Sequence, residues 1–517
     1  NELAYVKQLL PSISLVQINQ LAAELIPGKA NTLVAMIAPE KTDYVLPNAV
    51  QLTAQVEKAY LQPVQAYSEK VLSSQLIEKM PVPGKIIRQS QLPKIGLTTI
   101  EFANGIKILL KPTDFKNDEV LLSGYRDGGT SNYSELDSLN ATFAGSLSGI
   151  TGLGAFTPTD LRKILAGKIA SSSVSLSETK DMASGQSNAN DIETMLQLLY
   201  LQFTQVRQDA ELFDTFAGKA KPLLSQAGND PNQAFSDFYL RQLFQNHPRA
   251  GTLPSKVQID AMSFIRTQQI NRERFGNANG FTFILVGSFD VDKIKPLLAT
   301  YLGSLPVNTN KTSAYVDNGM RALKGSKRVE FAKGSEAKNL VYLSYNGEMK
   351  YDIDETFKLY FLKAILQIKL TEALREELSG VYSVSVSWQY NKTPYPNYYL
   401  KLSIPSAPEN SAALVTVSKS EIELLRKNGP SAADFAKVKE NYLNNLAIQL
   451  RENSYWLEQL GLFKQDGINL ESIPDYDRDL LSRLTPEDIQ IAAQRYLNPN
   501  NVFEAVLTPE TLTKESP

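Results

Sequence analysis

One arrangement of apolar and polar positions occurs three times along this chain. In each copy, apolar residues three or four positions apart predict an amphipathic helix, and a short polar turn containing Asn or Gly follows. A run rich in Val, Ile, Leu or Phe then predicts a strand. The copies cover residues 14–39, 263–287 and 485–509. Their separation far exceeds the ~20–50 residue period of solenoid proteins, so they indicate a duplicated domain, each copy marking the end of one domain.

This repeat predicts how the chain divides into domains. We expect residues 1–45 to be the C-terminal remnant of a preceding α+β domain, residues 46–95 a connector, residues 96–307 and 326–517 two further α+β domains, and residues 308–325 a polar linker between those two. The first large domain is expected to open with a β-hairpin, because Asn104-Gly105 separates two apolar runs. In such a turn both residues take positive φ.

Within the two large domains, helices and strands are mixed without strict strand–helix–strand alternation. Strands are expected at residues 120–125, 168–176, 281–286, 339–345, 381–390 and 398–404, and helices at 191–203, 232–244, 355–377, 412–427 and 432–450. The pattern predicts an α+β fold in which helices cover one face of a sheet, rather than a doubly wound α/β fold.

Composition and charge exclude two classes of partner. Apolar residues make up 43% of the 517 residues and charged residues 21%, which is typical of a globular protein. The formal net charge of −2 provides no field that would attract nucleic acid or an anionic membrane. No apolar run reaches the ~18 residues of a membrane span. We therefore expect neither nucleic-acid binding nor a membrane span.

Metal and nucleophilic chemistry are limited by the presence of one histidine, His247, and no cysteine. Protein zinc sites are built mainly from imidazole and thiolate ligands, so no metal site is expected in this chain. A Ser-His-Asp triad would have to use His247, and no Gly-x-Ser-x-Gly motif accompanies it. We interpret His247 as a loop or helix-end residue, and the glycines at positions 145, 149, 152 and 154 as a plain loop rather than a phosphate-binding one.

The candidate functional residues are Arg375 and Tyr382. Arg375 lies near the end of a predicted helix, Gly380 can cap that helix in the left-handed conformation, and Tyr382 opens the following strand. The guanidinium and the phenol could together stabilise an oxyanion or hold a peptide carbonyl. From spacing alone, a solvated arginine and a packed tyrosine are the simpler interpretation.

A family resemblance favours the functional interpretation. The segment around these residues resembles the pattern Arg-Glu-x-x-x-Gly-x-x-Tyr-Ser-Val in the C-terminal half of the pitrilysin/insulinase zinc metallopeptidases, with Arg375 and Tyr382 at its Arg and Tyr. Residues 284–290 and 301–306 resemble the element "VGxFD … Y(F/L)GxLP" that closes domains of this family. The Asn104-Gly105 hairpin resembles the "LxNGxxV" element that opens them. The resemblance covers most of the chain.

The resemblance implies four homologous two-layer α/β sandwich domains, arranged as two halves around a closed chamber. The N-terminal half of such enzymes binds zinc through His-x-x-Glu-His and a distal Glu, whereas the corresponding helix here, at residues 139–148, has neither His nor Glu. The chain is therefore expected to be the C-terminal, non-zinc half of a zinc metalloendopeptidase, inactive alone. Zinc is expected in an N-terminal half, which would belong to the same polypeptide or to a partner chain.

In the mechanism that the resemblance implies, zinc activates a water molecule and a Glu acts as the base. Arg375 and Tyr382 would stabilise the transition state or grip the peptide substrate. The alternative is a non-catalytic peptide-binding or scaffolding subunit of a peptidase-like complex. Analogy with the family favours a periplasmic or secreted location and leaves a cytoplasmic one open.

Overall fold

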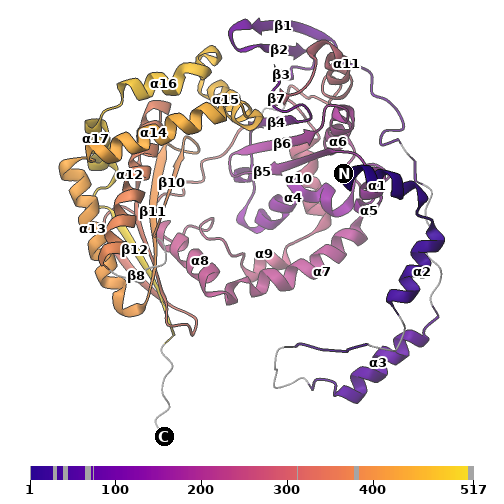
Figure 1. The fold of residues 1–517 in the computed structure, drawn as a ribbon, viewed down its shortest axis with the longest axis horizontal. Helices are drawn as coiled ribbons and strands as arrows, with labels where there is room; N and C mark the ends of the chain where they lie inside the picture. Colours follow the sequence, from indigo (N-terminus) through magenta and orange to yellow (C-terminus); the bar gives the residue numbers. More distant parts are fainter. Residues whose placement is uncertain are drawn as a thin grey trace. The chain divides into compact units, whose positions relative to one another are not determined.

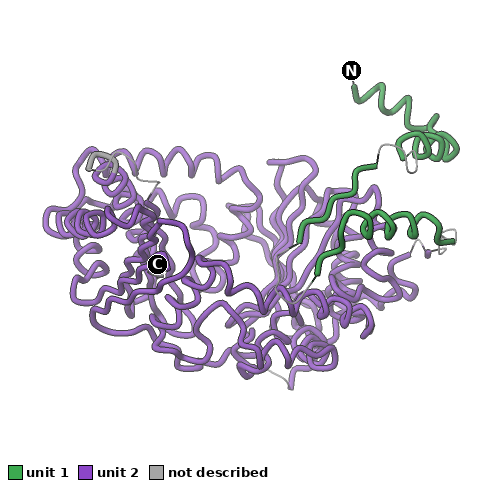
Figure 2. The backbone as a smooth tube through the Cα atoms, turned by 90° about the horizontal axis from the view of Figure 1, so that it is seen from below, with its two compact units in different colours: residues 1–71 green, residues 72–517 purple. Residues whose placement is uncertain are grey.

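The computed structural model describes residues 2–26, 32–38, 45–63, 72–73, 75–310, 313–377 and 384–510. The chain forms two compact units, Asn1–Val71 and Leu72–Pro517, which are coloured separately in Figure 2 and are described one at a time.

The first unit is helical in its described residues. It contains α1 (Glu2–Leu9), α2 (Leu15–Leu25) and α3 (Ala49–Leu61). The helix predicted in the first repeat is confirmed as α2, which begins at a capping box in which Ser14 and Gln17 bond each other's backbone N–H groups.

The prediction of a strand after α2 is wrong. Residues 32–38 have no regular secondary structure, and the side chains of Leu33 and Ile37 are 91% and 100% exposed. An apolar segment becomes a strand only when its backbone groups pair with a neighbouring strand. No strand in the described part of the chain pairs with this segment.

The second unit contains two sheets (Figure 1). In its described residues the first sheet has seven strands, in the order β1-β2-β3-β7-β4-β6-β5, and only the β3–β7 pair is parallel. These strands are β1 (Ile86–Leu92), β2 (Leu97–Phe102), β3 (Lys107–Pro112), β4 (Val120–Asp127), β5 (Ala170–Leu176), β6 (Lys180–Ser187) and β7 (Thr282–Gly287). The helices of this part are α4 (Ser138–Thr151), α5 (Pro158–Ile164), α6 (Ile192–Thr204), α7 (Ala210–Gln226), α8 (Pro231–Leu243), α9 (Lys256–Asp260), α10 (Phe264–Phe275) and α11 (Val291–Tyr301).

The second sheet has five strands in the described residues, in the order β10-β11-β9-β12-β8, and only the β12–β8 pair is parallel. These are β8 (Lys327–Ala332), β9 (Asn339–Glu348), β10 (Ser385–Asn391), β11 (Asn397–Ser406) and β12 (Val502–Thr508). The accompanying helices are α12 (Ile353–Glu377), α13 (Ser411–Asn428), α14 (Ala432–Gln449), α15 (Asn453–Asp466), α16 (Ile473–Arg483) and α17 (Pro486–Tyr496).

The two sheets share one strand topology. Read from β8, the second sheet runs β8-β12-β9-β11-β10, and the first sheet contains β3-β7-β4-β6-β5 with the same sequence of parallel and antiparallel pairs. The second and third sequence repeats are confirmed as α10 with β7 and α17 with β12, which occupy matching places in this topology. The α+β prediction and the predicted duplication therefore agree with the structure.

The predicted hairpin between β2 and β3 is confirmed, but its turn differs from the prediction. The N–H of Gly105 donates to the carbonyl of Phe102, so Ala103 and Asn104 are the central residues, and only Gly105 takes a positive φ, of 86°. The Asn104 side chain instead donates to the carbonyls of Leu302 and Leu305, at 3.2 and 3.3 Å. These bonds connect the hairpin to the residues that follow α11. Asn104 keeps a negative φ, so the predicted left-handed conformation is wrong for this residue.

Each sheet is covered on one face by a helix from the other half of the second unit. On the first sheet, one face packs against α6, α10 and α11, and the other packs against Trp456, Leu460 and Phe463 of α15. In return, Phe235 and Tyr239 of α8 pack on the second sheet, where the Tyr239 hydroxyl lies 2.6 Å from the Ser344 hydroxyl. Residues 72–517 are a single compact unit because of this exchange of helices.

A half-buried carboxylate in the α14–α15–α16 layer predicts a pH-dependent effect on stability. Burial raises the pKa of Asp477, although the hydroxyls of Tyr442 and Tyr455 donate to its Oδ2 at 2.8 and 3.5 Å. The unfolded chain has the lower pKa, so ionisation destabilises the fold once the pH exceeds that value, and this cost is complete above the folded pKa. We expect Asp477→Asn to raise the urea midpoint at pH 7 and to leave it unchanged near pH 3, where both states are protonated.

The matched control for this experiment is Asp479→Asn, which changes an exposed carboxylate on the same helix. It should leave the urea midpoint nearly unchanged at both pH values. A lower midpoint for Asp477→Asn at pH 7 would contradict the prediction.

Candidate functional site

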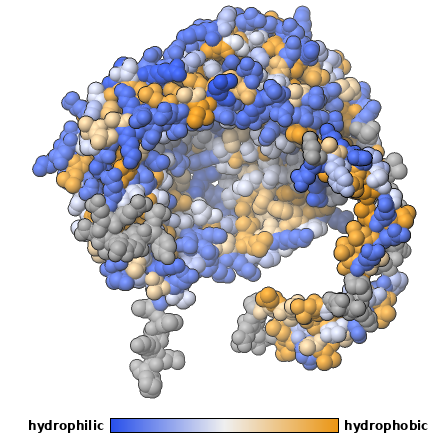
Figure 3. All heavy atoms as spheres, viewed as in Figure 1, coloured by the Kyte–Doolittle hydropathy of each residue, from blue (hydrophilic) through white to orange (hydrophobic). Residues whose placement is uncertain are grey.

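A cavity of about 1320 Å³ lies between the two sheets of the second unit. Its walls are β4 and β6 of the first sheet, β10 and β11 of the second sheet, and the helices α8 and α15. Figure 3 shows this hollow from the same side as Figure 1.

Along the strands that line the cavity, residues facing the cavity alternate with residues facing the core, because successive strand residues point to opposite sides of a sheet. On β11, Tyr399 and Lys401 line the cavity, whereas Leu400 and Leu402 are fully buried in the core on the other face. Tyrosines are frequent in the lining: Tyr125, Tyr239, Tyr315, Tyr351, Tyr390, Tyr395 and Tyr399. Burial raises the pKa of Tyr125 to about 12 and raises that of Tyr399 as well, so these phenols remain hydrogen-bond donors at neutral pH.

Three lysines add positive charge to the cavity. Lys392 pairs with Asp466 at 2.5 Å. Lys180 and Lys401 lie within ion-pairing distance of no carboxylate among the described residues, and burial lowers the pKa of both. Lys401 instead lies over the ring of Tyr342, 4.2 Å from its centre. The lining also contains the carboxylates of Asp127, Glu178, Glu458 and Asp466, so the cavity carries charges of both signs. Together with the tyrosines, these groups offer the hydrogen-bonding partners and flat apolar surfaces that suit a polypeptide.

The two predicted site residues lie at the edge of the described part of the chain or outside it. Arg375 lies in the last turn of α12, and its backbone alone is described. Tyr382 and Gly380 lie outside the described residues. The roles of Arg375 and Tyr382 therefore stay predictions.

The elements on either side of these residues are joined by Gln367 of α12. Its side-chain amide donates to the carbonyl of Val384 at 2.9 Å and accepts from the N–H of Val386 at 2.8 Å. These bonds fix α12 beside the start of β10, which lines the cavity from Ser387 onward. The sequence prediction missed Gln367, and its only signal is a polar residue between Leu366 and Ile368 in an apolar stretch.

His247 is confirmed as a loop residue after α8. Its Nε2 lies 3.1 Å from the carbonyl of Asn318, and its Nδ1 accepts from the N–H of Arg249 at 3.2 Å. Both ring nitrogens are therefore engaged in holding loops together. No group of three His, Cys, Asp or Glu side chains in the described ranges is arranged to hold a metal ion, so these residues do not fit a zinc site.

The helix predicted at residues 139–148 is confirmed as part of α4, and part of the predicted glycine loop belongs to this helix. Gly145 and Gly149 lie inside α4, and Gly152 ends the helix with a φ of 101°. A Cβ at Gly145 would lie 2.8 Å from the Cα of Ser175, so this glycine permits close packing of α4 on β5. The loop interpretation is wrong for the first two glycines because the helix continues through Thr151.

Next to the cavity, a network of buried ion pairs connects β4, β6 and α10. The Asp181 carboxylate is fully buried and accepts from Arg126 at 2.7 Å and from Arg274 at 2.6 Å. It also accepts from the N–H of Gly129 at 2.9 Å. Arg126, Asp127 and Lys180 beside this network line the cavity, so the network supports that wall.

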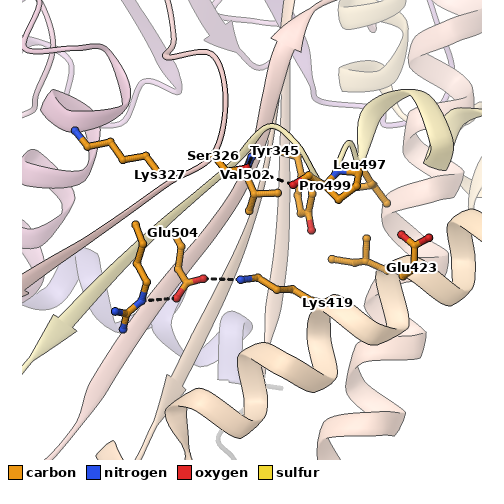
Figure 4. A pocket seen from close by; sticks show the side chains of 11 residues that line it. Ser326, Lys327, Tyr345, Lys419, Glu423, Leu497, Pro499, Val502 and Glu504 are labelled. Carbon is orange, nitrogen blue, oxygen red and sulfur yellow. Dashed lines mark hydrogen bonds and ion pairs between the residues drawn. The ribbon is translucent and has the colours of Figure 1, made fainter.

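A smaller pocket of about 510 Å³ lies beside β8, β12 and α13 (Figure 4). Glu504 lies within it and bonds both Arg328 at 2.9 Å and Lys419 at 2.7 Å. Because Glu504 pairs with both cations, we assign this cluster to holding α13 against the sheet.

Comparison with known proteins finds similarity to peptidases. Residues 272–442 match the family model described as the Peptidase M16 inactive domain. The chain is 24% identical over 522 residues to a zinc protease PQQL-like protein of Arabidopsis thaliana, covering 95% of this chain and 51% of the relative. It is 21% identical over 427 residues to the probable zinc protease PqqL of Escherichia coli strain K12, covering 80% and 44%. The chain thus spans about half the length of the curated relatives it matches.

Solved structures share the fold. The periplasmic protease PqqL from Escherichia coli matches with a TM-score of 0.75 and 18% identity, over 90% of this chain and 51% of that one. A peptidase M16 inactive domain from Pseudomonas fluorescens matches with a TM-score of 0.64 and 16% identity, over 80% and 98%. The first half of the Escherichia coli protease also matches, with a TM-score of 0.63 and 14% identity, over 83% and 93%. Among the described residues, no helix combines the length and apolar character that a membrane crossing needs.

Proposed function

Because this chain is homologous to the PqqL-like zinc proteases of the pitrilysin family and carries a peptidase M16 inactive domain, we propose that it is the non-zinc half of a zinc metalloendopeptidase. In this proposal it pairs with a zinc-binding half that carries His-x-x-Glu-His, encloses a peptide substrate and assists its hydrolysis. The zinc of the other half supplies the activated water. The observation that carries the proposal is the match of residues 272–442 to an inactive peptidase domain, because this range includes the cavity wall formed by β10 and β11.

The residues of this chain bind and orient the peptide. The cavity offers phenol and ammonium donors to peptide carbonyls and acidic side chains, and its aromatic rings offer flat surfaces to apolar side chains. Arg375 lies in the last turn of α12, Tyr382 stands in the sequence between α12 and β10, and β10 lines the cavity. In our proposal their guanidinium and phenol stabilise the oxyanion that forms at the scissile carbonyl, or hold the peptide backbone next to it.

The second candidate function is a non-catalytic peptide-binding or scaffolding subunit. A partner of this kind needs only the cavity, whose lining tyrosines and lysines can bind a peptide. The two candidates predict different behaviour of the assembled protein, not of the chain alone.

The test is peptidase activity and zinc content, measured for this chain alone and for this chain combined with a zinc-binding half. We expect the chain alone to be inert and free of zinc, and the combined protein to hold zinc and cleave peptides. An inert combined protein that still holds zinc would overturn the catalytic proposal and support the scaffolding one. By analogy with the periplasmic PqqL protease, we also propose a periplasmic location.

A further inference from the structure

We propose that Lys401, on the cavity face of β11, binds a carboxylate of the peptide, so that this chain selects peptides with an acidic group at one position. This inference rests on the proposed function for the presence of a peptide, and it specifies one feature of the substrate. The carboxylate belongs either to an aspartate or glutamate side chain or to the C-terminus of the peptide. Both present the same anion to an ammonium group.

The strand β11 fixes the place of Lys401 in the cavity wall. It lies between β9 and β10 in the second sheet, and Lys401 lines the cavity. Directly opposite Lys401 on these two strands are Ser344 and Ser387. Residues opposite each other on paired strands have neighbouring side chains on one face of the sheet. The nearest cross-strand neighbours of Lys401 therefore carry hydroxyl groups and no counter-charge.

Two tyrosine rings hold the ammonium group of Lys401. Its Nζ lies 4.2 Å from the ring centre of Tyr342 and 5.6 Å from that of Tyr239, and both tyrosines are buried. The face of a ring attracts a cation but is not an oxygen acceptor for its N–H groups. No described residue accepts a hydrogen bond from this Nζ. The rings therefore position the ammonium group and leave its N–H donors for a ligand.

Lys401 also differs from the other two cavity lysines in the charges around it. Lys392 forms an ion pair with Asp466 at 2.5 Å. The negative charges of Asp127 and Asp466 act on Lys180 and raise its pKa against the effect of burial. At Lys401, burial lowers the pKa, and no carboxylate among the described residues, including those that line the cavity, counteracts it. A cation that has lost water and has no counter-ion gains most from a bound carboxylate.

Hydroxyl donors stand beside the ammonium group on the same wall. The Ser387 hydroxyl, which lines the cavity, donates to the backbone carbonyl of Lys401 at 3.2 Å. Tyr399 lies two residues before Lys401 on the same face of β11, and burial raises the pKa of its phenol, so it remains a donor. A carboxylate has two oxygens that accept several hydrogen bonds. The ammonium group and these hydroxyls together match that set of acceptors.

The test is peptide binding to the 517-residue chain, measured by fluorescence anisotropy. The probe is a short threonine- and tyrosine-rich peptide with a neutral N-terminal dye, an amidated C-terminus and one central glutamate, and its partner has glutamine in that place. We expect the glutamate peptide to bind about tenfold more tightly. Lys401→Met should abolish this preference and Lys401→Arg should retain most of it, because arginine keeps the charge. Lys437→Met removes an exposed charge from α14 and should retain it fully. A preference that survives in Lys401→Met, or falls equally in Lys437→Met, would overturn the inference.

A third peptide distinguishes the two sources of the carboxylate. It carries the glutamine and ends in a free carboxylate. Tighter binding of this peptide than of the amidated glutamine peptide, lost in Lys401→Met, would support the inference and identify the chain terminus as the ligand. Failure of the parent chain to bind any of the three peptides would overturn the inference and leave the peptidase proposal to its own test. A glutamate preference in a combined protein without peptidase activity would support the inference and overturn only the catalytic proposal.

Discussion

Arg375→Ala and Tyr382→Phe should each lower the turnover of an enzyme assembled from both halves by about 10²–10³-fold. A preorganised donor stabilises the negative charge that develops on the scissile carbonyl, and its removal leaves that charge to weaker partners. If the two residues act on the transition state, kcat falls; if they grip the substrate in its ground state, KM rises instead. Steady-state kinetics on a defined peptide separates the two roles.

Matched controls are available on the same helix. Tyr360→Phe on α12 removes the same hydroxyl from a residue that is 45% exposed, and it should leave turnover unchanged. Arg375→Lys retains the charge but loses the fork of donors, so it should recover only part of the rate. Near-normal turnover in both Arg375→Ala and Tyr382→Phe would remove these residues from the mechanism.

Asp181→Ala should destabilise the second unit by about 3–5 kcal/mol, because it leaves the guanidinium groups of Arg126 and Arg274 buried without their carboxylate. Asp181 is fully buried, so water cannot replace the lost partner. The free energy of unfolding from urea denaturation measures this effect. Asp181→Asn retains the shape but loses the charge, and it should fall between the parent and the alanine variant.

The control for this prediction is an exposed pair of the same type. Lys256 and Asp260 pair at 2.6 Å on α9 with side chains that are 86% and 60% exposed. Asp260→Asn should cost no more than about 0.5 kcal/mol, because exposed pairs one helical turn apart contribute little. A similar loss in both asparagine variants would show that the Asp181 network is not a special source of stability.

The sequence predicted those parts of the fold that depend on local periodicity. The long helix α12 and the strand β9 carry apolar spacing that identifies them without knowledge of their neighbours. Residues 32–38 carry a strand pattern too, but strand formation depends on a partner, which no local pattern reveals. The hairpin turn was misplaced because the Asn104 side chain is used by distant carbonyls of Leu302 and Leu305.

The site was predicted less completely than the fold. The motif drew attention to Arg375 and Tyr382, but the cavity arises from sheets far apart in sequence, and no pattern in one strand predicts its facing wall. The amphipathic patterns of α8 and α15 predict a buried face on each helix, yet they do not indicate that each helix packs on the other half's sheet. The role of Gln367 depends on the same kind of long-range placement.

The exchange of α8 and α15 also sets the order in which this protein can fold during synthesis. The face of the first sheet that contains Leu97, Leu109 and Ile284 is covered by α15, which the ribosome makes long after β7 is complete. Until then that apolar face is open to chaperones and to aggregation with other nascent chains. A truncation before α15 would expose it permanently, so the first sheet depends for its solubility on a helix that is synthesised long after the sheet itself.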